Sequence, residues 1–201
     1  MTFYKNRGKF EGLSLMVGRV FSRLGLSPNQ WTFVTILPTL AALYFLVQKE
    51  FILSAIFFII ASFIDLVDGS VARVMGKVTK LGAYLDTMMD RYVEFLIVLG
   101  LLFIGLPDFF MPITFWIFIY YFGAIMTSYS KAAAKEKDLV DHEIKGGIAE
   151  RAERLILLFV GVLLAHFSLT YLTYMLVILA FLSNITALQR AFIAKKASEK
   201  K

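Results

Sequence analysis

Four aspartates lie close together in the sequence, between long runs of apolar residues. Asp65 and Asp68 are i,i+3, and Asp86 and Asp90 are i,i+4, so on α-helices each pair shares one face. Four neighbouring carboxylates repel one another when they are ionised, and two divalent cations would balance their charge. Oxygen ligands without histidine or cysteine suit hard cations such as Mg²⁺, Mn²⁺ or Ca²⁺. The spacing therefore predicts a divalent-metal site.

The composition predicts that a membrane surrounds these residues. The chain has 201 residues, of which 59% are hydrophobic and 18% are charged, and it contains no cysteine. Soluble domains average roughly 45–50% apolar and about 25% charged residues, so we exclude a soluble globular fold. A helix needs about 20 mostly apolar residues to cross a bilayer. We expect six such helices, at residues 29–47, 51–67, 81–106, 111–134, 151–165 and 169–192.

Basic residues set the expected orientation. Of the 21 lysines and arginines, all but Lys49 lie at the termini or beside the connections that follow the second and fourth spans. The positive-inside rule then makes both termini cytoplasmic. Within residues 10–26, apolar residues recur at helical spacing, which predicts an amphipathic helix on the membrane surface.

The predicted fold is an all-α integral membrane protein with six transmembrane helices and one N-terminal amphipathic interfacial helix. We expect a single domain over residues 1–201. It would consist of a juxtamembrane helix in 1–28, a transmembrane core in 29–192 and a basic tail in 193–201.

The aspartates have a structural alternative. Arg73 and Arg91 could form ion pairs with some of the aspartates. Two singly charged arginines, however, balance at most half of the charge of four carboxylates. Acidic groups inside a membrane segment are costly and usually functional. Gly69 and Gly82 stand beside the aspartates, where missing side chains let a ligand approach or let helices pack closely. Together with the carboxylates, the glycines favour the approach of a flat base or a phosphate.

One motif joins these residues, and it reads Asp65-x2-Asp68-Gly69-x2-Ala72-Arg73-x8-Gly82-x3-Asp86-x3-Asp90. It resembles the signature of the CDP-alcohol phosphotransferase family at every fixed position. The expected six-span layout is also similar to that family's membrane domain, so the resemblance covers nearly the whole chain. It implies that a CDP-linked donor gives its phosphoryl-alcohol group to an acceptor hydroxyl and releases CMP.

The resemblance also implies roles for single residues. Asp65, Asp68 and Asp86 would hold one Mg²⁺, and Asp65, Asp86 and Asp90 the second, with Mn²⁺ as a substitute. Asp90 would be the general base on the acceptor hydroxyl, a reaction that a nearby carboxylate can perform. The residues expected to bind the CDP group are Asn29, Thr32, Gly69, Ala72, Arg73, Thr79 and Gly82. Asn29 and Thr32 also fit a simple helix start with an early proline.

Further basic residues follow on the expected cytoplasmic side. The positive-inside bias accounts for them, but a group of cations also suits an acceptor that carries a phosphate. Ser-Tyr-x-Lys at 128–131, Glu-Arg-x-Glu-Arg at 150–154 and a late arginine resemble the phosphatidylinositol phosphate synthase branch, which includes archaeal archaetidylinositol phosphate synthases. Ala133 departs from an arginine that bacterial members often have. The residues expected to bind the acceptor phosphate are Ser128, Lys131, Arg151, Arg154 and Arg190.

We therefore expect a Mg²⁺-dependent transferase of phospholipid biosynthesis, in the cell membrane with its active site facing the cytoplasm. Its substrates would be a CDP-linked diacyl or archaeol lipid and inositol 1-phosphate. Glycerol 3-phosphate as acceptor and soluble CDP-inositol as donor stay open. A divalent-cation transporter is the alternative of another class, and it would need acids near the midplane with a path to both faces. By similarity we expect a homodimer, and we expect no nucleic-acid partner.

Overall fold

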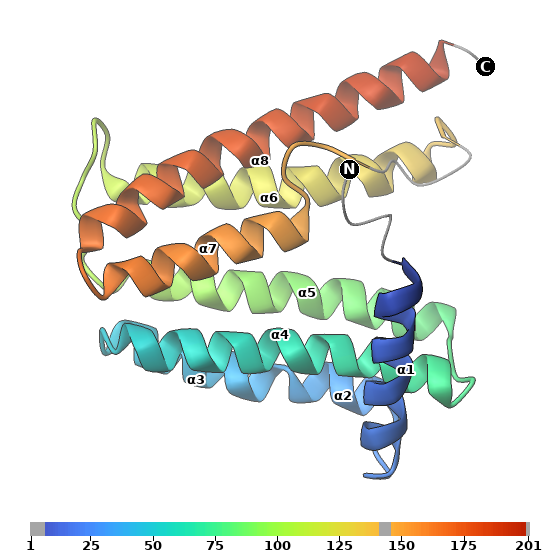
Figure 1. Ribbon diagram of the computed structural model, residues 1–201. Coiled ribbons are helices and arrows are strands. Elements are labelled where there is room, and N and C mark those ends of the chain that lie inside the picture. The colour runs from blue at the N-terminus through green and yellow to red at the C-terminus, as the bar shows by residue number, and fades with distance from the viewer. Residues whose placement is uncertain (1–6, 141–145, 200–201) are drawn as a thin grey trace. The chain divides into compact units, whose positions relative to one another are not determined.

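The computed structural model describes residues 7–140 and 146–199, and the elements that it contains there are helices (Figure 1). Within this part of the chain, extended pairing is limited to one isolated bridge between Phe109 and Met111. The expected all-α fold is therefore confirmed. The helices are α1 (Arg7–Ser22), α2 (Pro28–Val34), α3 (Ile36–Val47), α4 (Phe51–Val74), α5 (Lys80–Leu101), α6 (Ile113–Glu136), α7 (Arg151–Ala165) and α8 (Leu169–Ser198).

Among the described residues, four helical segments are long and apolar enough to cross a membrane, which makes this a multi-pass membrane protein. They are Pro28–Val47, Phe51–Val74, Ile113–Glu136 and Leu169–Ser198. The other two expected spans are also largely helical, although α5 ends at Leu101 and not at residue 106 as expected. However, α5 carries several charged residues, and α7 has only 15 residues, or roughly 22 Å at 1.5 Å per residue. The number of six spans and the side of the termini stay predictions.

Several helices extend further than the sequence predicts. The second expected span ends at residue 67, whereas α4 continues to Val74 and so carries the first half of the motif. It ends in a Schellman motif, because Gly76 has φ +62° and the N–H groups of Gly76 and Lys77 donate to the carbonyls of Arg73 and Ala72. At the other end of the chain, α8 runs to Ser198, so most of the expected tail at 193–201 is helical.

The first expected span is divided into α2 and α3. Ser27 begins α2 with a capping box, in which its hydroxyl accepts from the N–H of Gln30 and its own N–H donates to the Gln30 side chain. α2 ends at Val34. Pro38 has no N–H with which to bond the carbonyl of Val34, and this accounts for the break.

The described chain forms two compact units, one of residues 1–45 and 53–97 and one of residues 46–52 and 98–201. In the first unit Trp31, Val67 and Val71 are buried together, and Val17 and Phe21 of α1 pack against them. The rings of Phe21 and Trp31 meet edge to face at 5.3 Å. These contacts fix α1 across the C-terminal part of α4 (Figure 1).

In the second unit α8 packs against both α6 and α7. A Cβ atom on Gly123 of α6 would lie only 2.6 Å from the Asn184 side-chain nitrogen of α8, so glycine allows this close packing. Asn184 donates to the carbonyls of Ile119 and Ala180 at 2.9 and 2.8 Å. The polar residues inside this bundle are therefore used for helix-to-helix hydrogen bonds.

Candidate active site

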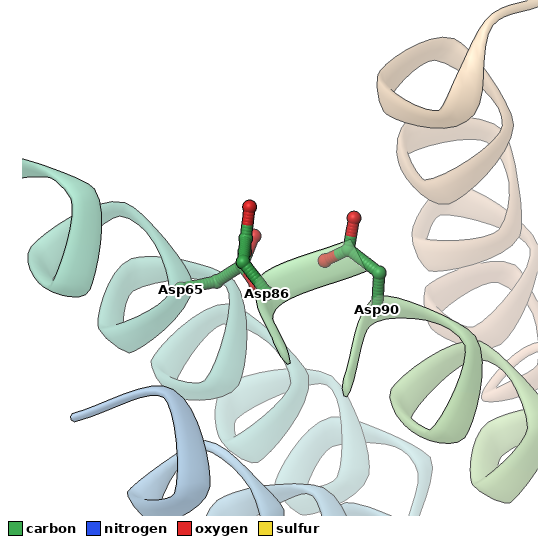
Figure 2. Close-up of side chains that lie close together, drawn as sticks. All are labelled: Asp65, Asp86 and Asp90. Carbon is green, nitrogen blue, oxygen red and sulfur yellow. The ribbon is translucent and has the colours of Figure 1, made fainter. Parts of the chain in front are cut away.

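Three of the four aspartates of the motif meet at one point of the first unit. Asp65 on α4 and Asp86 and Asp90 on α5 each offer a carboxylate oxygen, and these oxygens lie within 4.8 Å of one another (Figure 2). All three side chains are half-buried. The pairing of α4 with α5 that the motif predicts therefore exists. A set of carboxylate oxygens at such spacing is suited to a hard divalent cation.

Asp68 has a different environment. It lies on α4 three residues after Asp65 but is not one of the three grouped carboxylates. Its Oδ2 accepts a hydrogen bond of 2.7 Å from the hydroxyl of Thr32, and both residues are buried. This bond ties α2 to α4. Its expected role as a metal ligand stays a prediction.

The two arginines that the sequence offers as partners of the aspartates bond to different groups. Arg91 lies 3.8 Å from Asp90 Oδ2 and donates at 3.1 Å to Glu94, which is 1% exposed. The Arg73 guanidinium group instead donates to the hydroxyls of Ser14 and Ser70. Sequence reasoning did not single out Glu94, although its place one turn after Asp90 on α5 is a usable signal.

A cavity of about 300 Å³ opens beside the carboxylates and is lined by residues of α2, α4, α5 and the connection between α4 and α5. Asp86 lines the cavity and is also one of the three grouped carboxylates. Asp68 lines the cavity as well. Its volume is at the lower end of the range of small-molecule sites. The wall includes every residue expected to bind the CDP group, namely Asn29, Thr32, Gly69, Ala72, Arg73, Thr79 and Gly82.

Gly82 keeps one wall of the cavity open. A Cβ atom there would lie 3.1 Å from the Thr79 hydroxyl and 3.2 Å from the Asn29 side-chain oxygen. The Thr79 hydroxyl accepts from the N–H of Gly82 at 3.0 Å, which supports the first turn of α5. The absence of a side chain therefore leaves Asn29 and Thr79 facing the cavity without an intervening methyl group.

Lys77 also lines the cavity, and sequence reasoning missed it. It is exposed on the connection that follows α4. A lysine there adds a mobile positive charge, which suits phosphate oxygens. The signal in the sequence was a basic residue between the two halves of the motif, in the turn that brings them together.

The residues expected to bind the acceptor phosphate all lie in the second unit. Arg190 is 6% exposed and donates to the carbonyls of Thr127 and Gly146 at 2.8 and 3.2 Å, and to Glu150 at 3.4 Å. Arg154 is fully buried and donates to the carbonyl of Ala149 at 3.3 Å. Ser128, Lys131 and Arg151 are half-buried. The two buried arginines thus tie α7 and α8 to the main chain around them, and phosphate binding by this set stays a prediction.

Known proteins resemble this chain along most of its length. Residues 26–188 match the model of the CDP-alcohol phosphatidyltransferase family. The archaetidylinositol phosphate synthase of Pyrococcus horikoshii is 37% identical over 183 residues, which cover 91% of this chain and 91% of that protein.

Solved structures agree with this match. The Mycobacterium tuberculosis phosphatidylinositol phosphate synthase with CDP-DAG bound has a TM-score of 0.79 and 28% identity, and the match covers 90% of this chain and 92% of the other. The same enzyme in complex with manganese and citrate has a TM-score of 0.80 and 28% identity, covering 90% and 88% of the two chains. The resemblance of the aspartate motif is confirmed: the chain belongs to the CDP-alcohol phosphatidyltransferase family.

Proposed function

We propose that this enzyme transfers the phosphatidyl or archaetidyl group of a CDP-linked lipid to a hydroxyl of inositol 1-phosphate and releases CMP. The observation that carries the proposal is the double position of Asp86, which is both one of the grouped carboxylates and part of the wall of the neighbouring cavity. A pyrophosphate bound across this point would have its nucleoside in the cavity and its phosphates at the carboxylates. The CDP-DAG complex of the mycobacterial relative supports the same class of donor.

For the metal we propose two Mg²⁺ ions, with Mn²⁺ as a substitute, one held by Asp65, Asp68 and Asp86 and the other by Asp65, Asp86 and Asp90. The grouped carboxylate oxygens and the manganese complex of the relative support a divalent cation. When bound, the ions would polarise the pyrophosphate and stabilise the negative charge that develops on the departing CMP.

The remaining steps belong to side chains of this protein. Asp90 takes the proton of the acceptor hydroxyl, whose oxygen then forms a bond to the lipid-bearing phosphorus while the bond from that phosphorus to CMP breaks. Arg73 and Lys77 place positive charge at the cavity, where the phosphates would lie. Asn29 and Thr79 place polar side-chain atoms beside Gly82 in the cavity wall, where the nucleoside would lie.

We propose inositol 1-phosphate as the acceptor because of the cations in the second unit. Arg151, Arg154 and Arg190 are cations of this unit, and the guanidinium group can form two parallel hydrogen bonds to phosphate oxygens, which suits an acceptor that carries a phosphate. The name of the Pyrococcus horikoshii relative supports an inositol phosphate acceptor. Ser128 and Lys131 complete the proposed phosphate-binding set.

We further propose one domain of six transmembrane helices over the whole chain, working as a homodimer in the cell membrane with the active site and both termini on the cytoplasmic side. The distribution of basic residues supports this orientation. The homodimer is inferred by similarity to the family.

The test is an acceptor panel with purified protein in lipid vesicles. CMP release is measured with CDP-diacylglycerol, CDP-archaeol or CDP-inositol as donor, Mg²⁺ and either inositol 1-phosphate, glycerol 3-phosphate or free inositol. We expect release with inositol 1-phosphate alone. Release with glycerol 3-phosphate alone would show that glycerol 3-phosphate is the acceptor. Release with CDP-inositol as the only accepted donor would show that the donor is not a CDP-linked lipid. Metal flux through the vesicles without nucleotide turnover would instead support the transporter alternative.

A further inference from the structure

α1 lies unusually close to α4, and one glycine permits it. A Cβ atom on Gly18 would lie within van der Waals overlap of the Ser70 carbonyl oxygen and 2.7 Å from the Val74 side chain. Any larger residue would push the two helices apart. Ser14, one turn before Gly18, is on the same face of α1. The close approach brings its hydroxyl to α4.

Ser14 and Ser70 bind the guanidinium group of Arg73 together. One guanidinium nitrogen of Arg73, Nη2, donates to Ser14 Oγ at 2.6 Å and to Ser70 Oγ at 3.3 Å. The Ser70 hydroxyl donates to the carbonyl of Leu66 at 2.8 Å. The two serine oxygens are 2.8 Å apart, so Ser14 donates its own proton to Ser70. Both serine hydroxyl hydrogens then have a partner, and both serine oxygens accept from the guanidinium group.

These bonds leave the rest of the guanidinium group directed to the cavity. The other terminal nitrogen, Nη1, lies 3.4 Å from the position that a Cβ atom on Gly69 would take, and both Arg73 and Gly69 line the cavity. Arg73 is otherwise an exposed, long side chain. Fixing such a side chain costs rotamer entropy, which a ligand must supply when it binds unless the protein has ordered the side chain beforehand.

We propose that Ser14 is a positioning residue for the donor nucleotide: through Ser70 and Arg73 it holds a cationic guanidinium group in the cavity wall before the CDP group binds. α1 is thereby part of the donor site, although none of the residues of α1 whose side chains the structure describes, 12–22, lines the cavity. This inference rests on the proposed function, because it assigns the cavity to a cytidine diphosphate.

The experiment compares Ser14→Ala with wild-type protein in nanodiscs, with CMP release measured against CDP-lipid concentration. We expect the KM for the CDP-lipid and the Kd for CMP to rise roughly 3- to 10-fold, because one hydrogen bond to a charged group at a solvent-exposed site is lost. We expect kcat to remain unchanged. Ser14→Thr keeps the hydroxyl and should restore the affinity. Ser22→Ala is the matched control, since the Ser22 hydroxyl of the same helix donates to the main-chain carbonyl of Arg19 and not to Arg73.

A double-mutant cycle separates positioning from simple support of the fold. In an Arg73→Ala background, Ser14→Ala should cause no further loss of CMP affinity. An undiminished loss in that background, or wild-type affinity in the single variant, would overturn the inference and leave the proposed function intact. If wild-type protein releases no CMP from any CDP-lipid, the proposed function fails. The inference about Ser14 is then tested by comparing CMP binding to the wild-type protein and to Ser14→Ala. If the wild-type protein does not bind CMP, this inference is overturned as well.

Discussion

The hydroxyl of Thr32 on α2 is bonded to Oδ2 of Asp68 on α4 over 2.7 Å, and both side chains are buried. The two residues are 36 positions apart in the chain. A hydroxyl donor on one carboxylate oxygen fixes the plane of that carboxylate and leaves the second oxygen for another partner. Thr32 is therefore placed to orient Asp68 as well as to line the cavity.

Replacing Thr32 with valine removes this donor without changing the size of the side chain much. We expect the affinities for Mg²⁺ and for CMP to fall roughly tenfold, because a hydrogen bond to a charged group contributes about 1.5–3 kcal/mol. Isothermal titration of each ligand measures the effect. Thr39→Val is the control, because the buried Thr39 hydroxyl donates to the main-chain carbonyl of Thr35 and not to a carboxylate. Equal losses in both variants would contradict the prediction.

Asp90→Asn should lower kcat by about 10²–10⁴, the usual contribution of a general acid–base group. The amide cannot accept the proton of the acceptor hydroxyl, and it is a weaker ligand for a hard cation. Single-turnover CMP release is the measurement. Asp138→Asn is the control. Asp138 is exposed, and asparagine tolerates the φ of +53° at this position, so this variant should retain full activity. A fully active Asp90→Asn variant would exclude this base.

Removing divalent cations should abolish turnover and lower thermal stability. A ligand present at 100 times its Kd stabilises the folded state by about 2.7 kcal/mol, so Mg²⁺ or Mn²⁺ should raise the Tm of the chelator-treated protein. Asp65→Asn should remove most of that rise, since Asp65 is one of the grouped carboxylates. The prediction fails if the Tm of wild-type and variant respond equally to Mg²⁺.

Gly69→Ala should separate stability from ligand affinity. The added methyl group would meet the Arg73 guanidinium at 3.4 Å, an ordinary contact, so the helix should gain up to about 1 kcal/mol in stability. The same methyl group faces the cavity, and we expect roughly tenfold weaker CMP binding, which is about 1.4 kcal/mol. Gly12→Ala is the control, because a Cβ atom there has no neighbour within 4 Å. It should change neither CMP affinity nor CMP release.

Arg190→Lys tests the proposed acceptor site. Lysine keeps the charge but loses the planar fork that bonds the Thr127 and Gly146 carbonyls. We expect a higher KM for inositol 1-phosphate with an unchanged KM for the CDP-lipid, and a stability loss of about 1–3 kcal/mol from the unsatisfied carbonyls. Initial rates with each substrate varied in turn measure this. Lys195→Ala, an exposed cation on the same helix, should leave both KM values unchanged.

Much of the donor site followed from spacing alone. The i,i+4 interval of Asp86 and Asp90 and the short connection between α4 and α5 were enough to predict grouped carboxylates on facing helices. The nucleotide residues were predicted through the family resemblance, and all of them line one cavity. Helix ends were less predictable. The Schellman motif at Gly76, which lets α4 continue past the apolar residues, depends on backbone conformation rather than on hydropathy.

Contacts between distant segments could not be read from the sequence. Ser14 and Arg73 meet only because Gly18 lets α1 approach α4, and no periodicity in either segment encodes that pairing. Likewise, the cationic character of Arg190 suggested a phosphate ligand, whereas its hydrogen bonds to the main chain required the fold of the 146–150 segment. Tertiary geometry decides whether such a charge holds the protein together, binds a ligand, or does both.

The grouped carboxylates and the cavity lie entirely in one compact unit, while every residue proposed for the acceptor phosphate lies in the other. By this proposal, substitutions that alter the preferred alcohol would accumulate in one unit without disturbing activation of the donor in the other. Exchanging α6–α8 between homologues offers a route to enzymes that attach new head groups to an unchanged lipid precursor.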